Sequence, residues 1–382
     1  MSIFNFAFSP MPPQCEALRA EVRAFLQANG RDWTAASRAQ SWDGFDPEFS
    51  RKVGAHGWIG MTWPKRYGGG ERSALERHVV LEEMLVAGAP VSLHWIADRQ
   101  SGPLLLRFGT ERQRREILPA IARGTLCFCI GMSEPDAGSD VANIRTRAVR
   151  TETGWRVTGT KLWTTNAHRA HYMIGLFRTS GAPADRQRGL SQFLVDMTVP
   201  GITVRPLPDL AGREHFNEVT FDGALLPSDS LLGQESEGWS QTLAELALER
   251  SGPERFLSSI QALIELIRIK AAAASDEDRA TIGRLVAQLM TLRRMSLSVA
   301  GMLEAKQTPA LEAAVVKDLG TGFEQALPET VQSLLGLELD RDHGTELERA
   351  MAHLVRMAPA YSLRGGTREI LRGIIARGLG LR

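Results

Sequence analysis

The stretch Gly131-Met-Ser-Glu-Pro-Asp-Ala-Gly-Ser-Asp140 follows directly on the apolar run formed by residues 126–130. Its small residues and its proline predict an irregular turn at the end of a β-strand. Backbone amides in such a turn, together with the hydroxyls of Ser133 and Ser139, can bind a phosphate or a ring carbonyl. An ordinary strand-to-loop connection is the alternative, and this stretch alone is compatible with both.

A second stretch, Gly159-Thr-Lys-Leu-Trp-Thr-Thr-Asn166, places a tryptophan before two hydroxyl residues in a strand-like run. An indole offers a flat wall to an aromatic ring system, and a neighbouring threonine can hydrogen-bond to a ring nitrogen or carbonyl. This combination suits a flavin. The alternative is that Trp163 fills the core of a small barrel.

Around these two stretches the residue composition and pattern are typical of a β domain. Between residue 125 and about residue 232, β-branched and aromatic residues form short runs punctuated by glycine, which predicts a small barrel or sandwich. Residues 179–189, rich in Gly, Pro, Asp and Arg, predict an exposed hairpin loop. The predicted strands include residues 155–159, 171–177, 192–195, 202–205 and 217–221.

Helical periodicity dominates on both sides of this region. Apolar residues recur at spacings of three and four from residue 14 to about residue 124, and Gly109-Thr110 reads as a helix end followed by an N-cap. Periodicity returns from residue 238. We therefore predict an α+β protein, mostly α, with helical residues 1–124, a β domain at 125–234 and a helical bundle at 235–382. The longest predicted helices cover residues 256–274, 278–306, 311–335 and 368–379.

Composition excludes several classes of protein. The 382 residues include 45 Lys and Arg against 44 Asp and Glu, so the formal net charge is only +1. Because binding to nucleic acid or anionic lipid depends on a strongly basic surface, neither is expected as a partner. Residues 1–20 contain three prolines and no long apolar stretch, which predicts a cytoplasmic protein without a membrane span.

The three cysteines do not suggest a disulfide framework. Cys127 and Cys129 are separated by one residue in an apolar run, so strand geometry points both thiols to the same face. Such a pair could bind a metal ion, but no cluster of His or Cys accompanies it in the sequence. We expect two buried thiols in a strand and no metal site.

Four motifs in this order and spacing resemble the acyl-CoA dehydrogenase family over essentially the whole chain. They are the segment from Phe108-Gly-Thr-Glu-Arg-Gln to Leu118-Pro119, the SEPDAGSD run, the GTKLWTTN run and the GGTREILRGIIAR run that begins at Gly365. The resemblance implies an N-terminal helical domain, a central β domain and a C-terminal four-helix bundle. It also implies an FAD cofactor, held between the last two domains and across a subunit interface.

The resemblance further implies which residues contact ligands. Ser139 would also lie near the thioester of an acyl-CoA substrate, and an electron-transfer flavoprotein would accept the electrons. The chain would form a homodimer or homotetramer. The flavin contacts implied by the matching motifs are Met132, Ser133, Ser139, Trp163, Thr164, Thr165, Gly366 and Thr367.

The family reaction needs a carboxylate base for the α-proton of the thioester. Many members carry it as the Glu of a Tyr-Glu-Gly-Thr run, but residues 364–367 here read Arg-Gly-Gly-Thr, so Gly365 stands in its place. Some members instead use a Glu-Arg pair on a C-terminal helix, which Leu248-Glu249-Arg250 matches. The resemblance thus implies that Glu249 is the base and that Arg250 holds a phosphate or polar group of CoA or the cofactor. A solvated helix surface is the alternative for Glu249. Glu369 is a weaker candidate that is expected near a helix N-terminus.

A second departure concerns the subunit interface. Family members commonly carry an Arg-x-x-Phe-Gly run that reaches the FAD of a neighbouring subunit, and residues 271–288 do not reproduce it. Two other functions follow as alternatives. The chain could be a non-catalytic or half-active partner subunit of a heteromeric acyl-CoA dehydrogenase, or a flavin-dependent oxidase or monooxygenase on the same scaffold.

Overall fold

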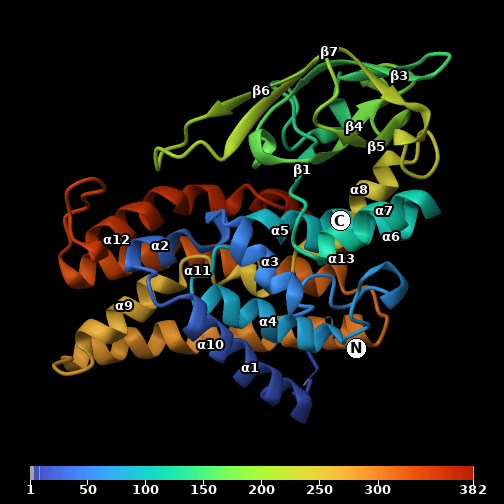
Figure 1. The fold of residues 1–382 in the computed structure, drawn as a ribbon. Helices are drawn as coiled ribbons and strands as arrows, with labels where there is room; N and C mark the ends of the chain where they lie inside the picture. Colours follow the sequence, from blue (N-terminus) through green and yellow to red (C-terminus); the bar gives the residue numbers. More distant parts are fainter. Residues whose placement is uncertain (1–3, 8, 382) are drawn as a thin grey trace. The chain divides into compact units, whose positions relative to one another are not determined.

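The computed structural model describes residues 4–7 and 9–381, with the side chains of residues 245–249 excepted. The chain forms two compact units, and most of their helices and strands are labelled in Figure 1. We call them the helical unit (Met1–Phe49, Arg72–Ser92 and Glu249–Arg382) and the sheet unit (Ser50–Glu71 and Leu93–Leu248). Both units draw on the N-terminal third of the chain.

Eight α-helices of the described chain lie wholly in the helical unit, and α10 shows why they form where they do. Ser275 caps α10 by accepting a hydrogen bond from the Asp278 amide, and the Asp278 carboxylate accepts one from the Ser275 amide in return. The carboxylates in its first turn also favour the positive end of the helix dipole. The helices are α1 (Pro13–Asn29), α2 (Ala35–Gln40), α4 (Ala74–Val86), α9 (Ile260–Lys270), α10 (Asp276–Glu304), α11 (Ala310–Leu335), α12 (Glu346–Met357) and α13 (Arg368–Gly378).

Helix α4 crosses the interior of the helical unit and carries two buried carboxylates. Glu82 accepts hydrogen bonds from Arg19 of α1 at 3.0 Å and from Arg293 of α10 at 2.5 Å. Glu83 is bonded to Arg19 and, at 2.7 Å, to Arg23. Because each buried charge has an opposite partner, these ion pairs join α1, α4 and α10 without leaving an unpaired carboxylate.

The long helices predicted in the C-terminal region are present in the structure, but the residues at which they begin and end differ. Residues 278–306 and 311–335 correspond to α10 and α11, whereas the predicted helix at 256–274 shortens to α9, because a 3-10 turn at Pro253–Arg255 and a bend precede it. Helix α12 was not predicted. Its capping box at Thr345 and Glu348 and the buried side chains of Met351 and Leu354 were the signals that could have identified it.

The sheet unit contains one curled seven-stranded sheet with the order β1-β4-β2-β3-β7-β6, in which β5 also pairs with β4. Strand β1 runs parallel to β4, whereas β3, β7 and β6 are antiparallel neighbours. The five predicted strands correspond to β3 to β7, and the one predicted at 171–177 begins one residue before β4. Strand β2 is short and largely polar and was not predicted. The strands are β1 (Phe128–Gly131), β2 (Arg147–Arg150), β3 (Gly154–Lys161), β4 (Tyr172–Arg178), β5 (Leu190–Asp196), β6 (Ile202–Leu207) and β7 (Phe216–Pro227).

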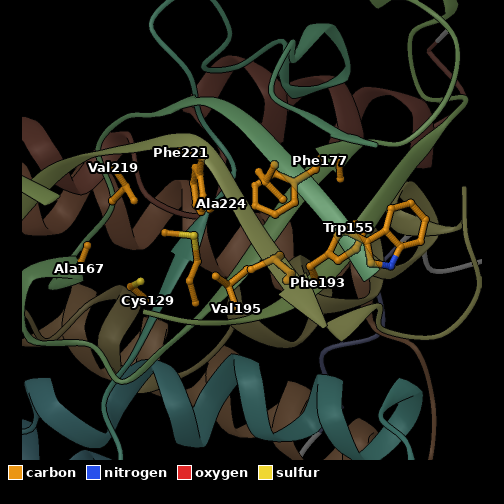
Figure 2. Close-up of a cluster of buried hydrophobic side chains, with 13 residues drawn as sticks. Cys129, Trp155, Ala167, Phe177, Phe193, Val195, Val219, Phe221 and Ala224 are labelled. Atoms are coloured by element: carbon orange, nitrogen blue, oxygen red, sulfur yellow. The ribbon is translucent and has the colours of Figure 1, made fainter. Parts of the chain in front are cut away.

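Aromatic side chains fill the inside of this sheet (Figure 2). Phe177 of β4 lies with its ring centroid 5.5 Å from that of Phe193 on β5 and 5.2 Å from that of Phe221 on β7. Trp155 of β3 meets Phe193 edge-on at 5.1 Å. Four strands thus contribute to one aromatic core, which holds the curvature of the sheet.

The loops and helices of the sheet unit follow the predicted turn chemistry. The hairpin loop predicted at residues 179–189 connects β4 to β5, which are antiparallel. Gly109 ends α6, and Thr110 caps α7 through a capping box with Gln113. No helix in the described part of the chain is long and apolar enough to cross a membrane. The remaining α-helices are α3 (Pro47–Ala55), α5 (Ser92–Ile96), α6 (Gly102–Phe108), α7 (Glu111–Ala122) and α8 (Gly238–Glu249).

The cysteines allow a direct test of the packing. Cys15, Cys127 and Cys129 are free and buried, as predicted for the latter two. Burial raises the pKa of Cys127 to about 12 and raises the pKa values of Cys15 and Cys129 as well. Because only a thiolate reacts, we expect the native protein to react very slowly with a thiol-specific disulfide reagent and the unfolded protein to react at three sites. Fast reaction of a native thiol would contradict this packing.

A second test concerns acid stability. The buried His94 lies 2.9 Å from the Ser50 hydroxyl, and burial lowers its pKa from 6.5 to about 4. Between those pH values the unfolded chain binds a proton that the folded chain excludes, so this contribution to stability is present above pH 6.5 and is lost as the pH falls towards 4. At about 1.4 kcal/mol for each pKa unit, the loss approaches about 3 kcal/mol.

We therefore expect His94→Asn, which keeps a polar group near the Ser50 hydroxyl, to reduce the pH dependence of the free energy of unfolding between pH 6.5 and 4. The measurement is urea unfolding across this pH range. His343→Asn, the same substitution at an exposed histidine, is the matched control. Equal slopes for the wild type and His94→Asn would contradict the prediction.

Candidate functional site

The turn at residues 131–140 is closed by its own backbone and by one buried carboxylate. Glu134 and Ala137 exchange backbone hydrogen bonds of 3.0 and 3.1 Å. The Glu134 carboxylate then accepts the amides of Arg145 at 2.6 Å and Thr146 at 2.9 Å. The turn is therefore held in one shape, with Ser133 half-buried and Ser139 exposed.

The two motifs of the sheet unit are joined to each other. The Leu162 amide donates a 2.9 Å hydrogen bond to the Ser133 carbonyl, and Lys161 Nζ lies 2.8 Å from the Glu134 carboxylate and 3.1 Å from the Met132 carbonyl. Met132 packs beside an apolar cluster under the turn. The structure thus joins the SEPDAGSD and GTKLWTTN runs through Met132, Ser133 and Glu134 on one side and Lys161 and Leu162 on the other.

Trp163 lies in an exposed bend after β3, not in the core of the sheet. Strand β3 ends at Lys161, and Trp163 adopts a left-handed backbone conformation with φ of +59°, so the prediction that the strand-like run continues towards Asn166 is wrong. A non-glycine residue in this region costs on the order of 1–3 kcal/mol and must be held by its surroundings. The indole is 57% exposed and meets Phe216 edge-on at 5.9 Å, which also argues against a core-filling role.

The residue that follows Trp163 faces inward. Thr164 is 1% exposed, its amide donates to the Asn217 carbonyl at 3.0 Å, and its carbonyl accepts from Asn217 Nδ2 at 2.9 Å. Its hydroxyl makes no hydrogen bond to any described residue. A buried hydroxyl without a partner costs about 1–3 kcal/mol, so it is suited to bind a ligand atom. Thr165 is half-buried.

These features fit the flavin that the sequence predicts. An exposed indole supplies a flat apolar surface, and a buried hydroxyl beside it supplies a directed donor and acceptor, which together match the face and the polar edge of a planar heteroaromatic ring. The closed turn beside them presents backbone amides and two serines, which match a phosphate or a ring carbonyl.

In the helical unit, the C-terminal motif begins with two glycines in left-handed conformations. Gly365 has φ of +68° and Gly366 has φ of +97°, a region that side chains with a Cβ rarely occupy. Arg250 Nε donates to the Gly365 carbonyl at 3.2 Å, and the fully buried Lys317 donates to the Gly366 carbonyl at 2.9 Å. Thr367 then forms the N-cap of α13, as predicted, although its hydroxyl makes no capping hydrogen bond.

The residue before the glycines is anchored as well. Arg364 donates to the Glu324 carboxylate at 3.0 Å and to the Ser258 hydroxyl at 2.6 Å, and its guanidinium lies over the rings of Trp42 and Tyr361 at 4.1 and 4.6 Å. The glycine turn is therefore fastened by three cationic side chains, of Arg250, Lys317 and Arg364. The residues at the aligned position of the usual glutamate form a rigid backbone corner without a carboxylate.

The two candidates for the base differ in what the structure describes. Glu249 is the last residue of α8, but its side chain lies outside the described residues. Glu369 is the second residue of α13, where its own backbone amide and then the Thr367 hydroxyl hold the pKa of its carboxyl below the ordinary value. Glu369 therefore lies near the N-terminus of a helix, as predicted, where the helix dipole favours a carboxylate.

Several anchoring residues were not identified from the sequence. Arg178 is the clearest: it is fully buried and donates to the carbonyls of Ala142 and Ile144, which follow the turn, and to those of Arg186 and Arg188 in the hairpin loop. Charged residues at inward-facing strand positions were the available signal. Lys161, Asn217 and Lys317 are further buried polar residues that anchor backbone carbonyls and were not identified as anchors from the sequence.

Comparison with known proteins identifies the class of this protein. Three family descriptions match in order: "Acyl-CoA dehydrogenase, N-terminal domain" at residues 12–125, "middle domain" at 129–224 and "C-terminal domain" at 237–380. Together they span nearly the whole chain. The chain therefore belongs to the acyl-CoA dehydrogenase family, and it is an oxidoreductase of that class.

Two relatives from Mycobacterium tuberculosis are each 32% identical. The acyl-CoA dehydrogenase IpdE1 matches 96% of this chain and 97% of its own length, whereas FadE34 matches 87% of this chain, which spans only 46% of FadE34. A solved "Tcur3481-Tcur3483 steroid ACAD" has a TM-score of 0.85 at 27% identity and covers 100% of this chain and 99% of its own. The ChsE4-ChsE5 complex from M. tuberculosis has a TM-score of 0.84 at 28% identity and covers 98% and 99%.

Proposed function

We propose that this protein oxidises the bond between the α and β carbons of an acyl-CoA thioester, with FAD as its cofactor and Glu249 as the base that takes the α-proton. Membership of the acyl-CoA dehydrogenase family supports the general reaction. FAD, when bound, accepts the hydride that leaves the β carbon. The carboxylate at position 249 must be ionised and within reach of the α-proton when the substrate is bound.

The observation that carries this proposal is the hydrogen bond of 3.2 Å between Arg250 and the Gly365 carbonyl. Arg250 directly follows Glu249, so the C-terminal end of α8 is tied to the turn from which the usual glutamate is missing. In this proposal the Glu249 carboxylate therefore acts as the base in place of the glutamate that is missing at Gly365.

The other candidate residues bind and orient FAD and the acyl-CoA substrate. Trp163, Thr164 and Thr165, with Met132, Ser133 and Ser139, are the proposed FAD contacts in the sheet unit, and Gly366 and Thr367 are the proposed FAD contacts in the helical unit. Ser139 and Arg250 also bind polar groups of the acyl-CoA. Electrons pass on to an electron-transfer flavoprotein.

A second candidate function is favoured by one observation. The Arg-x-x-Phe-Gly run is missing from residues 271–288, so a neighbouring copy of this chain would lack its usual interface contact with FAD. One similar solved structure is described as a complex of ChsE4 with ChsE5. The chain could accordingly work as one subunit of a heteromer in which a related chain supplies the missing contact, in place of a homodimer or homotetramer.

The test is to purify the chain alone, record its visible spectrum and oligomeric state, and add straight, branched, ring-bearing and steroid-bearing CoA thioesters without oxygen. A yellow oligomer that bleaches supports the proposal, and the most effective thioester identifies the substrate class. A colourless monomer would favour the partner-subunit function, which co-purification with a related chain would then test. Rapid reoxidation of the bleached protein by air would instead indicate an oxidase or monooxygenase.

A further inference from the structure

Lys161 and Glu134 form a buried ion pair between the two stretches that face the cofactor in the proposed function. We propose that this pair is a positioning element, which sets the spacing of the two loops that hold FAD and so controls FAD affinity. The inference rests on the proposed function. It assigns a role to two charged side chains that the proposed reaction itself does not use.

The pair is central to the sheet unit and shielded from solvent. Lys161 is 0% exposed and Glu134 is 7% exposed, and Lys161 Nζ lies 2.8 Å from Glu134 Oε1. The same ammonium donates to the Met132 carbonyl at 3.1 Å and lies 5.6 Å from the ring centroid of Phe177 in the aromatic core. Lys161 therefore connects the core of the sheet to the loop that begins at Met132.

Glu134 extends this connection to a third segment. Its carboxylate also accepts the amides of Arg145 and Thr146, so one side chain fixes residues 131–140, 145–146 and the end of β3. The next amide along from Lys161, that of Leu162, donates to the Ser133 carbonyl at 2.9 Å. Side-chain and backbone contacts thus fix the position of one loop relative to the other.

The bend that carries Trp163 is held on both sides. Lys161, two positions before Trp163, anchors the chain on one side, and Asn217 anchors Thr164 on the other side through hydrogen bonds of 3.0 and 2.9 Å. Trp163 itself adopts the left-handed conformation that requires such support. Loss of the Lys161 anchor would free one side of this bend and displace the indole and the Thr164 hydroxyl from the positions that suit a flat ring.

Stability alone does not explain the pair. Taking two charges out of water cancels most of their attraction, and replacing a buried ion pair by uncharged side chains is often neutral for stability. Burial alone would raise the pKa of Glu134, but Lys161 and the hydrogen bonds lower it, so the carboxylate stays ionised at neutral pH. An uncharged apolar side chain at residue 161 could not bind both the carboxylate and the Met132 carbonyl, which is the feature that sets the loop spacing.

The experiment compares the variants Lys161→Met, Glu134→Gln and the double variant with the wild type. Each is stripped of FAD, its melting temperature is recorded, and FAD is titrated back to obtain Kd. We expect FAD Kd to rise by at least about tenfold in both single variants and in the double variant. The melting temperature should fall in Lys161→Met, which leaves Glu134 unpaired, and should recover partly in the double variant. Arg205→Gln, which breaks an exposed pair with Glu218, is the control and should change neither quantity.

A purely structural pair would give a different result. If FAD Kd stayed within about threefold of the wild type in all three variants while the melting temperatures fell, the positioning role would be overturned. If Lys161→Met fails to fold, Glu134→Gln, which keeps the shape of the side chain, decides the question by the same criterion.

Failure of the proposed function can be recognised separately. If the wild type binds no FAD, alone or with a related chain, the proposed function is wrong, and hydrogen exchange of the peptide containing Leu162 then tests the positioning role without a cofactor. Exchange at least about tenfold faster in Lys161→Met or Glu134→Gln than in the wild type supports the role. Unchanged exchange overturns it.

Discussion

Glu249→Gln is expected to leave the protein yellow and to abolish the bleaching of its flavin by an acyl-CoA thioester. An amide has almost the shape of the carboxylate but cannot take the α-proton, so the rate of flavin reduction should fall by about 100- to 10,000-fold. FAD binding should be unaffected because the proposed flavin contacts lie elsewhere. Stopped-flow absorbance after anaerobic mixing with the best thioester of the substrate screen measures both properties.

Glu369→Gln is the matched control for this result. Glu369 lies in the first turn of α13, where its own backbone amide and the Thr367 hydroxyl hold its carboxylate, and we expect that variant to bleach at nearly the wild-type rate. Bleaching by Glu249→Gln at the wild-type rate would show that Glu249 is not the base. Loss of bleaching in Glu369→Gln with a normal flavin spectrum would move the assignment to Glu369.

Glu324→Leu is expected to cause a large loss of stability. Glu324 is 1% exposed and holds both the Ser258 amide at 2.7 Å and Arg364 at 3.0 Å. Removing one partner of a buried ion pair leaves the other charge uncompensated, which costs about 3–5 kcal/mol. Urea unfolding followed by tryptophan fluorescence measures this difference in the free energy of unfolding.

Two further variants separate the buried charge from the lost packing. Arg364→Met combined with Glu324→Leu removes both charges, so part of the stability should return. The exposed pair of Arg205 and Glu218 provides the comparison, because Arg205→Gln should cost less than about 1 kcal/mol. A cost for Glu324→Leu as small as that of Arg205→Gln would show that Glu324 is not an essential partner of Arg364.

The candidate site was predictable where its residues are close in sequence. The SEPDAGSD run predicts a turn because small residues and proline restrict the backbone locally, and the structure contains that closed turn. The GTKLWTTN run predicts the aromatic and hydroxyl residues but not their directions. Trp163 turns outward and Thr164 inward because the chain enters a left-handed conformation after β3, a change that the alternation of side chains in a strand does not anticipate.

In the fold as well, several features that depend on neighbours in sequence were predicted, whereas features that depend on tertiary contacts were not. Helix caps such as Thr110, and the hairpin loop at residues 179–189, depend on neighbours in sequence and were predicted. Strand β2 was not, because its few apolar residues give a weak periodic pattern and tertiary packing stabilises it. Helix α12 was missed although its capping box and its apolar residues at helical spacing are local signals in the sequence. The contribution of N-terminal segments to both compact units likewise depends on distant contacts.

The sequence by itself determined the α, β, α order, the family and the residues that are candidates for chemistry, because each of these follows from residue types and spacings along the chain. Only the tertiary structure decided that Lys161 pairs with Glu134, that Arg364 pairs with Glu324, and that Arg250 reaches the Gly365 carbonyl. The partners in these pairs are separated by 27, 40 and 115 residues. Contacts over such separations form only once burial has brought the segments together, since these hydrogen bonds and ion pairs act at short range and leave no periodic signal in the sequence.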